Sequence, residues 1–257
     1  MKKIVLLLIS IVIVFSLYST ENELLQQGIF HYQNNEFENA LDSFLQAKEH
    51  GLNNPDLLYN IGNTYFRLDN IPQAIIYYKR ALLLDSSYKP AKENLNYAMS
   101  LTQDIQSIEN NSFLNKFSTK IINTFSINTI FFFIVILLSI IIIFIHLQWI
   151  DSNRKISTLI DKAILRFINY VLIFILLLFL GLGITRINFV NNFNEAVIFD
   201  TISNVYSGPA ESFTRLFTVH QGTIIKIHKE ENEWSQISTL TGYNGWIKNN
   251  SYHKVKE

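Results

Sequence analysis

Residues 55–88 read PDLLYNIGNTYFRLDNIPQAIIYYKRALLLDSSY, and they repeat the pattern of residues 21–54 at a distance of 34 residues. Small and aromatic side chains recur without a gap: Gly28, Ala40, Phe44 and Ala47 in the first stretch, and Gly62, Ala74, Tyr78 and Ala81 in the second. A repeat of this length with small residues at these spacings predicts a helix–turn–helix unit that stacks on its neighbour. Units of this kind bind other proteins and seldom catalyse reactions.

The apolar residues of the second stretch follow a helical period, and Gly62 and Ala74 allow two antiparallel helices to approach closely. Asn35–Glu36 and Asp69–Asn70 supply turn chemistry between the helices. The pattern resembles the tetratricopeptide repeat (TPR), which implies an α-solenoid. A further amphipathic helix is expected to cover the last open face, so that two repeat units and a capping helix occupy residues 21–107.

The first helices of a TPR stack form a concave surface, and the resemblance implies a protein-binding groove there. The side chains expected on it are Tyr32 in the first unit and Tyr59, Asn60, Asn63, Phe66 and Arg67 in the second. Asn63 and Arg67 lie one helical turn apart, both are expected to be exposed, and they are suited to hold an extended peptide by its backbone or by a carboxylate. The alternative is an ordinary solvated helix face that carries a few aromatic side chains.

Two long apolar runs follow the repeats. Residues 129–147 (TIFFFIVILLSIIIIFIHL) and 167–185 (FINYVLIFILLLFLGLGIT) contain no Asp, Glu, Lys or Arg. Each has about the 20 residues that a helix needs to cross a bilayer, and soluble helices rarely continue so far without a polar face. Transmembrane helices in contact with the lipid bilayer are therefore predicted at residues 128–148 and 166–187, with a linker at residues 108–127.

The N-terminal segment is basic and then apolar. Lys2 and Lys3 precede an apolar run that ends near Tyr18, a pattern typical of a secretory signal. The residues around Tyr18 make a poor cleavage site, so residues 1–20 are predicted to be a signal peptide or an uncleaved N-terminal anchor. The sequence contains no cysteine, which excludes a lipid-bearing cysteine, disulfides and thiol catalysis.

Positive charge indicates which way the predicted spans run. The segment between them, residues 149–165, carries Arg154, Lys155 and Lys162, and Arg166 follows it. Short basic loops stay in the cytoplasm, and the basic N-terminus should stay there too. Both soluble regions are then expected in the periplasm, anchored to the bacterial cytoplasmic (inner) membrane.

From residue 194 onward, short apolar runs separated by turn residues predict a small all-β barrel. Residues 194–257 resemble the bacterial SH3 domain in four places: Ser207-Gly208-Pro209, LFTVHQGT at 216–223, Trp234 and Gly245-Trp246-Ile247. The aromatic residues expected at an exposed ligand face, next to turns, are Tyr206, Phe213 and Trp234, whereas Trp246 is expected in the core. Extracytoplasmic SH3-like domains often bind cell-wall peptides, so the resemblance implies such a ligand by analogy.

The sequence shows none of the motifs that carry common enzyme chemistry. It holds no phosphate-binding loop, no HExxH, no GxSxG and no dinucleotide motif, and its six histidines show no metal-ligand spacing. Lys plus Arg number 21 and Asp plus Glu number 21, and this balance gives no sign of nucleic acid as a partner. We therefore expect a non-enzymatic protein without cofactor, metal or nucleic acid.

The chain is thus predicted to be a multi-domain membrane protein with an α-solenoid, two transmembrane helices and an SH3-like barrel. This domain order resembles the BatE family of the bacterial aerotolerance operon. The resemblance implies association with von Willebrand A-domain Bat proteins and, directly or indirectly, with a MoxR-type ATPase. The leading hypothesis is a membrane-anchored scaffold that binds proteins outside the cytoplasmic membrane. The alternative is an envelope sensor whose barrel binds a cell-wall ligand and signals through the spans to a cytoplasmic partner.

Overall fold

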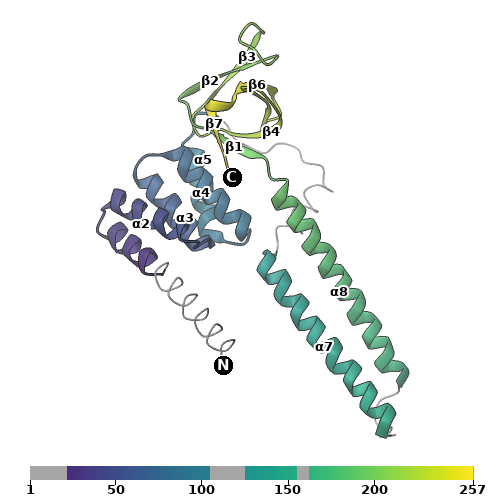
Figure 1. Cartoon of the computed structure of the whole chain (residues 1–257). Coiled ribbons are helices and arrows are strands. Elements are labelled where there is room, and N and C mark those ends of the chain that lie inside the picture. Colours follow the sequence, from purple (N-terminus) through teal and green to yellow (C-terminus); the bar gives the residue numbers. More distant parts are fainter. Residues whose placement is uncertain (1–21, 105–124, 155–161, 257) are drawn as a thin grey trace, which may run out of the picture. The chain divides into compact units, whose positions relative to one another are not determined.

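The computed structural model describes residues 22–104, 125–154 and 162–256. The expected signal or anchor segment, most of the expected linker and the middle of the basic loop lie outside the described residues. A first helix covers residues 22–33. The other helices are α2 (Phe37–Glu49), α3 (Pro55–Arg67), α4 (Ile71–Leu84), α5 (Lys89–Ser100), α7 (Ile127–Arg154) and α8 (Lys162–Asn191) (Figure 1).

Seven strands and a short 3-10 helix follow the last α-helix (Figure 1). They are β1 (Glu195–Ile198), β2 (Ile202–Tyr206), β3 (Arg215–His220), β4 (Ile224–Glu231), β5 (Trp234–Thr239), β6 (Asn244–Lys248), η1 (Asn249–Ser251) and β7 (Tyr252–Lys254). The expected order of helical repeats, two long apolar helices and a C-terminal sheet is confirmed.

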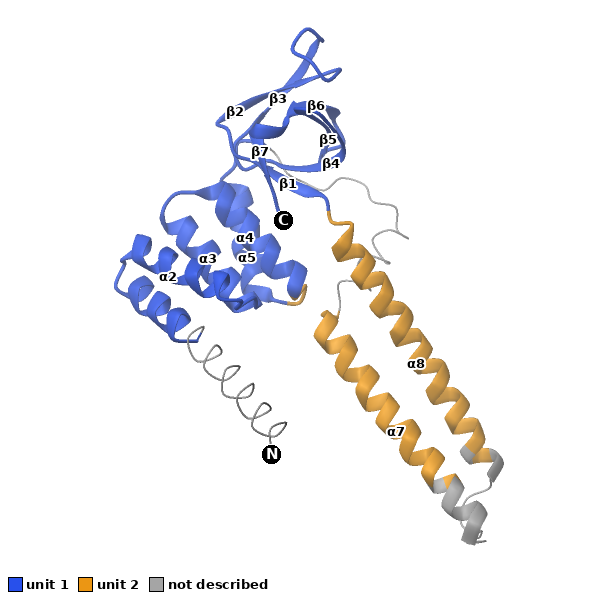
Figure 2. Ribbon diagram, viewed as in Figure 1, with its two compact units in different colours: residues 1–84, 88–111, 194–257 blue, residues 85–87, 112–193 orange. Residues whose placement is uncertain are grey.

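The described elements belong to two compact units, drawn in blue and orange in Figure 2. The first unit combines the helices up to α5 with all seven strands. The second contains α7 and α8, together with the short turn at residues 85–87. The long apolar segment is therefore inserted in sequence between two parts of one compact unit.

The repeat units are held together by contacts between glycine and an aromatic ring. A Cβ atom added to Gly62 would lie 2.7 Å from the ring of Tyr78, and one added to Gly28 would overlap the ring of Phe44. Tyr78 and Phe44 are both buried. The absence of a side chain at each glycine thus allows the second helix of each unit to pack closely on the first.

The turns inside the two units are equivalent as well. Asn35 has a φ of 62° and Asp69 a φ of 58°, so both adopt the left-handed conformation 34 residues apart. Asn and Asp tolerate this conformation better than most residues other than glycine. The expected turns are therefore present. After the second unit, α5 is the expected amphipathic helix, and it buries Ala91, Leu95 and Ala98.

The seven strands form one antiparallel sheet in the order β3-β2-β6-β5-β4-β1-β7. The sheet is curved (Figure 1). The buried apolar side chains of its core are Ala196, Ile198, Val205, Val219, Ile225, Ile227, Ile237, Ile247 and Tyr252. Register shifts in β2 and β4 mark irregularities that bend the strands. The edge strand β7 pairs only with β1, and the helical repeats lie beyond it within the same unit.

In the second unit, α7 and α8 form an antiparallel hairpin. The rings of Phe133 and Phe179 lie 5.4 Å apart, and Ile130 packs close to Gly183. Both helices are long and apolar enough to cross a membrane, with mean hydropathies of 3.0 and 2.7 over their candidate spans. Their helical bounds extend beyond the predicted spans at both ends.

Candidate functional site

Side chains from α3, α4 and α5 meet around Asn63. Its Oδ1 accepts hydrogen bonds of 2.8 Å from both the hydroxyl of Tyr78 and the Nδ2 of Asn94. Asn94 also donates a 3.3 Å hydrogen bond to the hydroxyl of Tyr59. The expectation that Asn63 is exposed is wrong: it is half-buried, because its amide joins three helices. Burial raises the pKa of Tyr78, so its hydroxyl stays protonated and can donate.

Arg67 is exposed, as expected, and lies against the first repeat unit. Its guanidinium carbon lies 4.2 Å from the ring centroid of Phe37 and 6.0 Å from that of Tyr32. Its Nη2 donates a 3.2 Å hydrogen bond to Asn35. The cation–π contact and this hydrogen bond hold the positive charge of Arg67 where the two repeat units meet. The structure thus brings two of the predicted groove residues, Tyr32 and Arg67, close together.

The remaining groove residues of α3 are half-buried, and α5 adds one that the sequence reasoning missed. Phe66 lies with its ring 5.6 Å from that of Tyr97, which is 59% exposed. The main-chain oxygen of Asn60 accepts a hydrogen bond from Thr64. Tyr97 lies on the side of α5 away from its buried residues. The helical periodicity of the capping helix could therefore have revealed that Tyr97 is exposed. We call Tyr32, Tyr59, Phe66, Arg67 and Tyr97 the aromatic face.

The two tryptophans of the sheet have exchanged their expected places. Trp234 was expected at the surface but is buried, with 8% exposed, because Tyr206 and Lys248 cover its ring. The Tyr206 ring packs edge-on at 5.5 Å, and the Lys248 ammonium lies 5.9 Å from the ring centroid. Trp246 was expected in the core but is only half-buried. Alternation explains this, since Gly245 and Ile247 on either side of it point inward.

The third predicted ligand-face residue of the sheet lies apart from these rings. Phe213 is exposed and packs over Gly208, where an added Cβ would lie 2.6 Å from its ring. Tyr206 is half-buried. The three predicted residues therefore form a contacting pair, Tyr206 and Trp234, and a separate exposed phenylalanine.

A polar junction joins the helical repeats to the sheet. The Nζ of Lys79 lies 2.5 Å from a carboxylate oxygen of Glu195, and both side chains are largely buried. The Nε of Arg80 donates a 2.6 Å hydrogen bond to the main-chain oxygen of Val255. These contacts connect α4 to β1 and to the end of β7, across more than a hundred residues of sequence.

Asp104 makes a second connection between the repeats and the sheet. Its Oδ2 accepts hydrogen bonds from the backbone N–H of His220 at 2.8 Å and from the hydroxyl of Thr223 at 2.6 Å. Its Oδ1 lies 2.8 Å from Nδ1 of His220. Burial by itself would raise the pKa of Asp104, but these hydrogen bonds lower it below 3.8. We call Asp104, His220 and Thr223 the acid latch.

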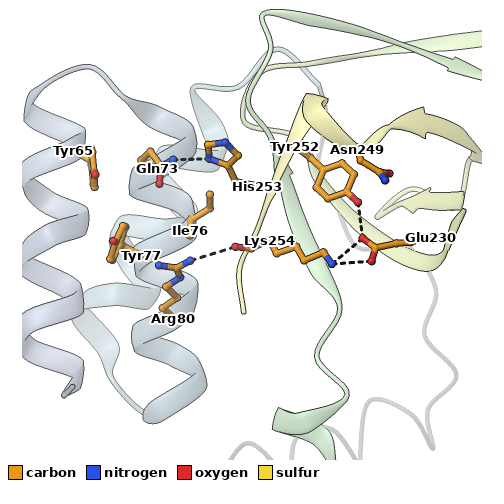
Figure 3. A pocket seen from close by; sticks show the side chains of 10 residues that line it. All are labelled: Tyr65, Gln73, Ile76, Tyr77, Arg80, Glu230, Asn249, Tyr252, His253 and Lys254. Carbon is orange, nitrogen blue, oxygen red and sulfur yellow. Dashed lines mark hydrogen bonds and ion pairs between the residues drawn. The ribbon is translucent and has the colours of Figure 1, made fainter. Parts of the chain in front are cut away.

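A cavity of about 640 Å³ lies beside the Arg80 contact, between the helices and the sheet. Figure 3 shows Tyr65, Gln73, Tyr77 and Arg80 on the helical side, facing side chains of the sheet. The lining residues on the sheet side are Glu230, Asn249, Tyr252, His253 and Lys254. Gln73 and His253 close one part of it through a 2.8 Å hydrogen bond between their side chains. The sequence reasoning did not find this cavity, because it needs residues that are distant in the chain.

Within the described residues, no cluster of three or more His, Asp or Glu side chains is arranged to hold a metal ion. Two acidic residues near the β4–β5 turn are instead paired with basic ones. Glu230 contacts Lys254, and Glu231 contacts Lys229.

Two protein families match separate parts of the chain. Residues 200–252 match the bacterial SH3 domain, and residues 55–88 match the tetratricopeptide repeat. Both predicted resemblances are therefore confirmed at the level of the domain. Domains of these two kinds are typical of protein interaction modules and not of enzymes. A search among curated proteins gave no match.

Among solved structures, the helical part is similar to two TPR domains. One is the first TPR of Spaghetti (RPAP3) bound to the HSP90 peptide SRMEEVD, with 23% identity, a TM-score of 0.31 and coverage of 32% of this chain and 65% of that chain. The other is the Sgt2 TPR domain from Aspergillus fumigatus, with 24% identity, a TM-score of 0.30 and coverage of 31% and 53%. The chain spans less than two thirds of either structure.

Proposed function

We propose that this chain is a membrane-anchored scaffold of the bacterial envelope that binds other proteins through its repeats and its SH3 domain. The observation that carries the proposal is the pair of connections between the repeats and the sheet, the polar junction and the acid latch. Residues before the apolar hairpin, such as Lys79 and Asp104, bond to residues after it, such as Glu195 and His220. The hairpin therefore interrupts one compact unit in the sequence without separating its two parts.

This arrangement supports two membrane crossings. An even number of crossings returns the chain to the side from which it started, so the repeats and the SH3 domain can meet. Most apolar side chains of α7 and α8 are exposed, which costs free energy in water but none in a lipid interior. The soluble unit would then stand on one side of the membrane, and the short connection between α7 and α8 on the other.

The periplasmic side is favoured by charge and by domain type. Basic residues are concentrated in the connection between the predicted spans, and this charge supports a cytoplasmic location for that connection. A bacterial SH3 domain is also typical of the cell envelope. The scaffold hypothesis therefore places the aromatic face in the periplasm, where membrane or periplasmic proteins are its expected partners.

The domain order further suggests a role like that of the BatE family. In that case the partners are von Willebrand A-domain Bat proteins, with a MoxR-type ATPase reached directly or through them. The support for this part is the sequence of a TPR region, two apolar helices and an SH3 domain in one chain.

Topology can be tested with single cysteines, because the chain has none of its own. Glu38→Cys on α2 and Asn204→Cys on β2 place a thiol at exposed positions of the repeats and the sheet. Ser157→Cys places one in the connection between the spans. In spheroplasts, an impermeant maleimide should label the first two and should label Ser157→Cys only after permeabilisation. If only Ser157→Cys is labelled from outside, the orientation is the opposite of the one proposed.

Partner binding can be tested with a photo-crosslinking amino acid at Tyr97 in intact cells. The scaffold proposal expects specific protein adducts at this position, because Tyr97 is exposed beside Phe66 on the aromatic face. The matched control carries the same amino acid at Glu38, on the second helix of the first unit. Identical adducts at both positions would argue against the aromatic face. Binding of purified cell wall by the full chain, without protein adducts, would instead favour the sensor hypothesis.

A further inference from the structure

The strand β3 leaves one of its edges without a partner in the sheet. It stands at the end of the strand order and pairs only with β2 among the described strands (Figure 1). The opposite edge of the sheet, at β7, is different, because Arg80 of α4 donates hydrogen bonds to the main-chain oxygens of Lys254 and Val255 there. A free edge presents backbone N–H and C=O groups to which another extended chain can bond.

The pairing of β3 shows which backbone groups lie on this open edge. Consecutive residues of a strand direct their N–H and C=O groups to opposite edges. The N–H of His220 donates to the carboxylate of Asp104 and not to β2, so Thr218, two residues earlier, has both of its backbone groups on the open edge. There Thr218 has no hydrogen-bond partner among the residues that the structure describes. The contact of Asp104 shows that this edge accepts a polar partner from outside the sheet.

Apolar side chains are exposed next to this edge. Leu216 is 50% exposed and has no residue opposite it in β2, because the register of the two strands shifts there. Tyr243 is 66% exposed, and its ring lies 5.7 Å from that of Phe217, which packs against the core of the sheet. Phe213, two residues before the strand, is 48% exposed. Exposed apolar side chains beside a free edge favour association with another chain.

Arg215 adds a positive charge at the beginning of the strand. Its side chain is exposed and makes no ion pair or hydrogen bond with any residue that the structure describes. The acid nearest to it in the sequence, Glu211, is already paired with Lys248. A carboxylate on a bound chain would therefore meet Arg215 without displacing an existing contact.

We propose that the open edge of β3 binds an extended segment of a partner protein, and that this segment carries apolar residues and an acidic residue. The bound segment would pair with the backbone of Thr218, place an apolar side chain against Leu216 and Tyr243, and bring its carboxylate to Arg215. The inference rests on the proposed scaffold function. It assigns to the SH3 domain a binding surface of its own, separate from the aromatic face of the repeats.

The experiment measures how a synthetic strand binds to the full chain in detergent micelles. The probe is the peptide Thr-Val-Asp-Val-Thr-Val with a fluorophore at its N-terminus and an amidated C-terminus. Fluorescence anisotropy reports binding, and micelles without protein are the blank. One analogue carries N-methyl groups on the three Val residues, and a second carries them on the other three residues. Because a bound strand bonds to β3 through alternate residues only, one analogue should lose about tenfold in affinity and the other should bind like the parent peptide.

Two variants test the assigned residues. Thr218→Pro removes the N–H on the open edge and leaves the pairing with β2 intact, since Pro is tolerated where the N–H of an edge strand faces solvent. Arg215→Gln removes the positive charge. Each should weaken binding of the peptide about tenfold, and Arg215→Gln should bind the peptide no better than the wild type binds an analogue with Asn in place of Asp. Lys226→Gln, at an exposed lysine of β4, is the matched control and should bind like the wild type.

Circular dichroism checks that the variants are folded, and if Thr218→Pro is not, Arg215→Gln with the Asp and Asn peptides decides. Equal binding of the two N-methylated analogues, equal binding of the Asp and Asn peptides, or no binding at millimolar concentration would overturn the proposal. Tighter binding by Arg215→Gln would also overturn it, because the charge would then protect the edge from pairing. So would dimers of the full chain that Thr218→Pro abolishes, because a second copy would then cover the edge. The scaffold proposal is tested separately, by adducts at Tyr97 and by thiol labelling, so failure of one can be told from failure of the other.

Discussion

Tyr78 and Phe174 are both large aromatic residues on α-helices, yet 1% of the first and 62% of the second is exposed. The same contrast holds for isoleucine: Ile75 in the repeats is fully buried, whereas Ile142 in the hairpin is 64% exposed. Burial of apolar surface contributes about 25 cal/mol per Å² in water. The repeats and the sheet use this contribution to fold, and the hairpin leaves most of it unused. The two units therefore suit different surroundings, which in our proposal are water for the first unit and lipid for the second.

The largest expected effect comes from removing one aromatic ring from each unit. Trp234→Ala should destabilise the sheet by about 3–5 kcal/mol, because it leaves a cavity under Tyr206 and Lys248. Phe174→Ala should leave the stability of the repeats and of the sheet unchanged. Hydrogen exchange of the full chain in micelles, followed separately for residues 195–256 and 22–104, measures both effects. Comparable protection of residues 195–256 in the two variants would contradict the assignment of Trp234 to the core of the sheet.

Trp246→Ala is the control inside the sheet. Trp246 is half-buried, so its removal should cost less than removal of Trp234. A larger loss for Trp246→Ala would mean that the sequence-based assignment of the core was right and the structural one wrong.

The next effect concerns charge placed at exposed apolar positions. Ile142→Asp should disfavour membrane insertion of α7 by up to about 3 kcal/mol, because an Asp inside a span must leave water. Phe30→Asp in the repeats, at a residue that is 61% exposed, should be tolerated. Alkaline extraction of membranes measures how much of each variant remains inserted. If Ile142→Asp is retained like the wild type, the exposed side chains of the hairpin do not face lipid.

A methyl group added to one glycine in each unit should have opposite effects. Gly62→Ala should destabilise the repeats by about 1–3 kcal/mol, since the new Cβ would lie 2.7 Å from the buried ring of Tyr78. Gly181→Ala meets nothing within 4 Å and should be neutral or gain up to about 1 kcal/mol from helix propensity. Thermal unfolding by circular dichroism in micelles compares the two. Destabilisation by Gly181→Ala would indicate a partner on that side of α8.

Local and periodic features made the repeats predictable from the sequence. Gly62 and Tyr78 recur at fixed positions of both units, and contacts within a unit join residues that are close in the chain. Asn35 and Asp69 were recognisable as turn residues because few other residues adopt their left-handed conformation. The length and composition of α7 and α8 were equally visible, because a bilayer-spanning helix needs a long apolar run.

The sheet and the junction were less predictable. The exchange of Trp234 and Trp246 depends on which face of a strand points inward, and a shift of one residue reverses every side chain. Side chains alternate between the two faces of a strand. Applied to β6, this alternation would have placed Ile247 inward and Trp246 outward. The acid latch joins residues 116 apart, on either side of the hairpin. No periodicity within a single sequence indicates such a pair.

The weakest effect we expect is a pH dependence of the contact between the repeats and the sheet, which involves the first compact unit alone. The pKa of Asp104 is lowered below 3.8 when the latch is formed, so the joined state binds fewer protons than the separated one. The latch should therefore contribute fully at pH values above 3.8 and be lost as the pH falls through the lower, folded pKa. Because Asp104 is partly exposed, we expect only about a few-fold change in the ratio of joined to separated molecules.

Spin labels at Glu38→Cys and Asn204→Cys would report the distance between repeats and sheet by pulsed electron paramagnetic resonance between pH 7 and pH 3. Asp104→Asn is the reference variant, because the pH dependence that it removes belongs to the latch. An identical pH profile in Asp104→Asn and the wild type would show that the latch does not hold the two domains together.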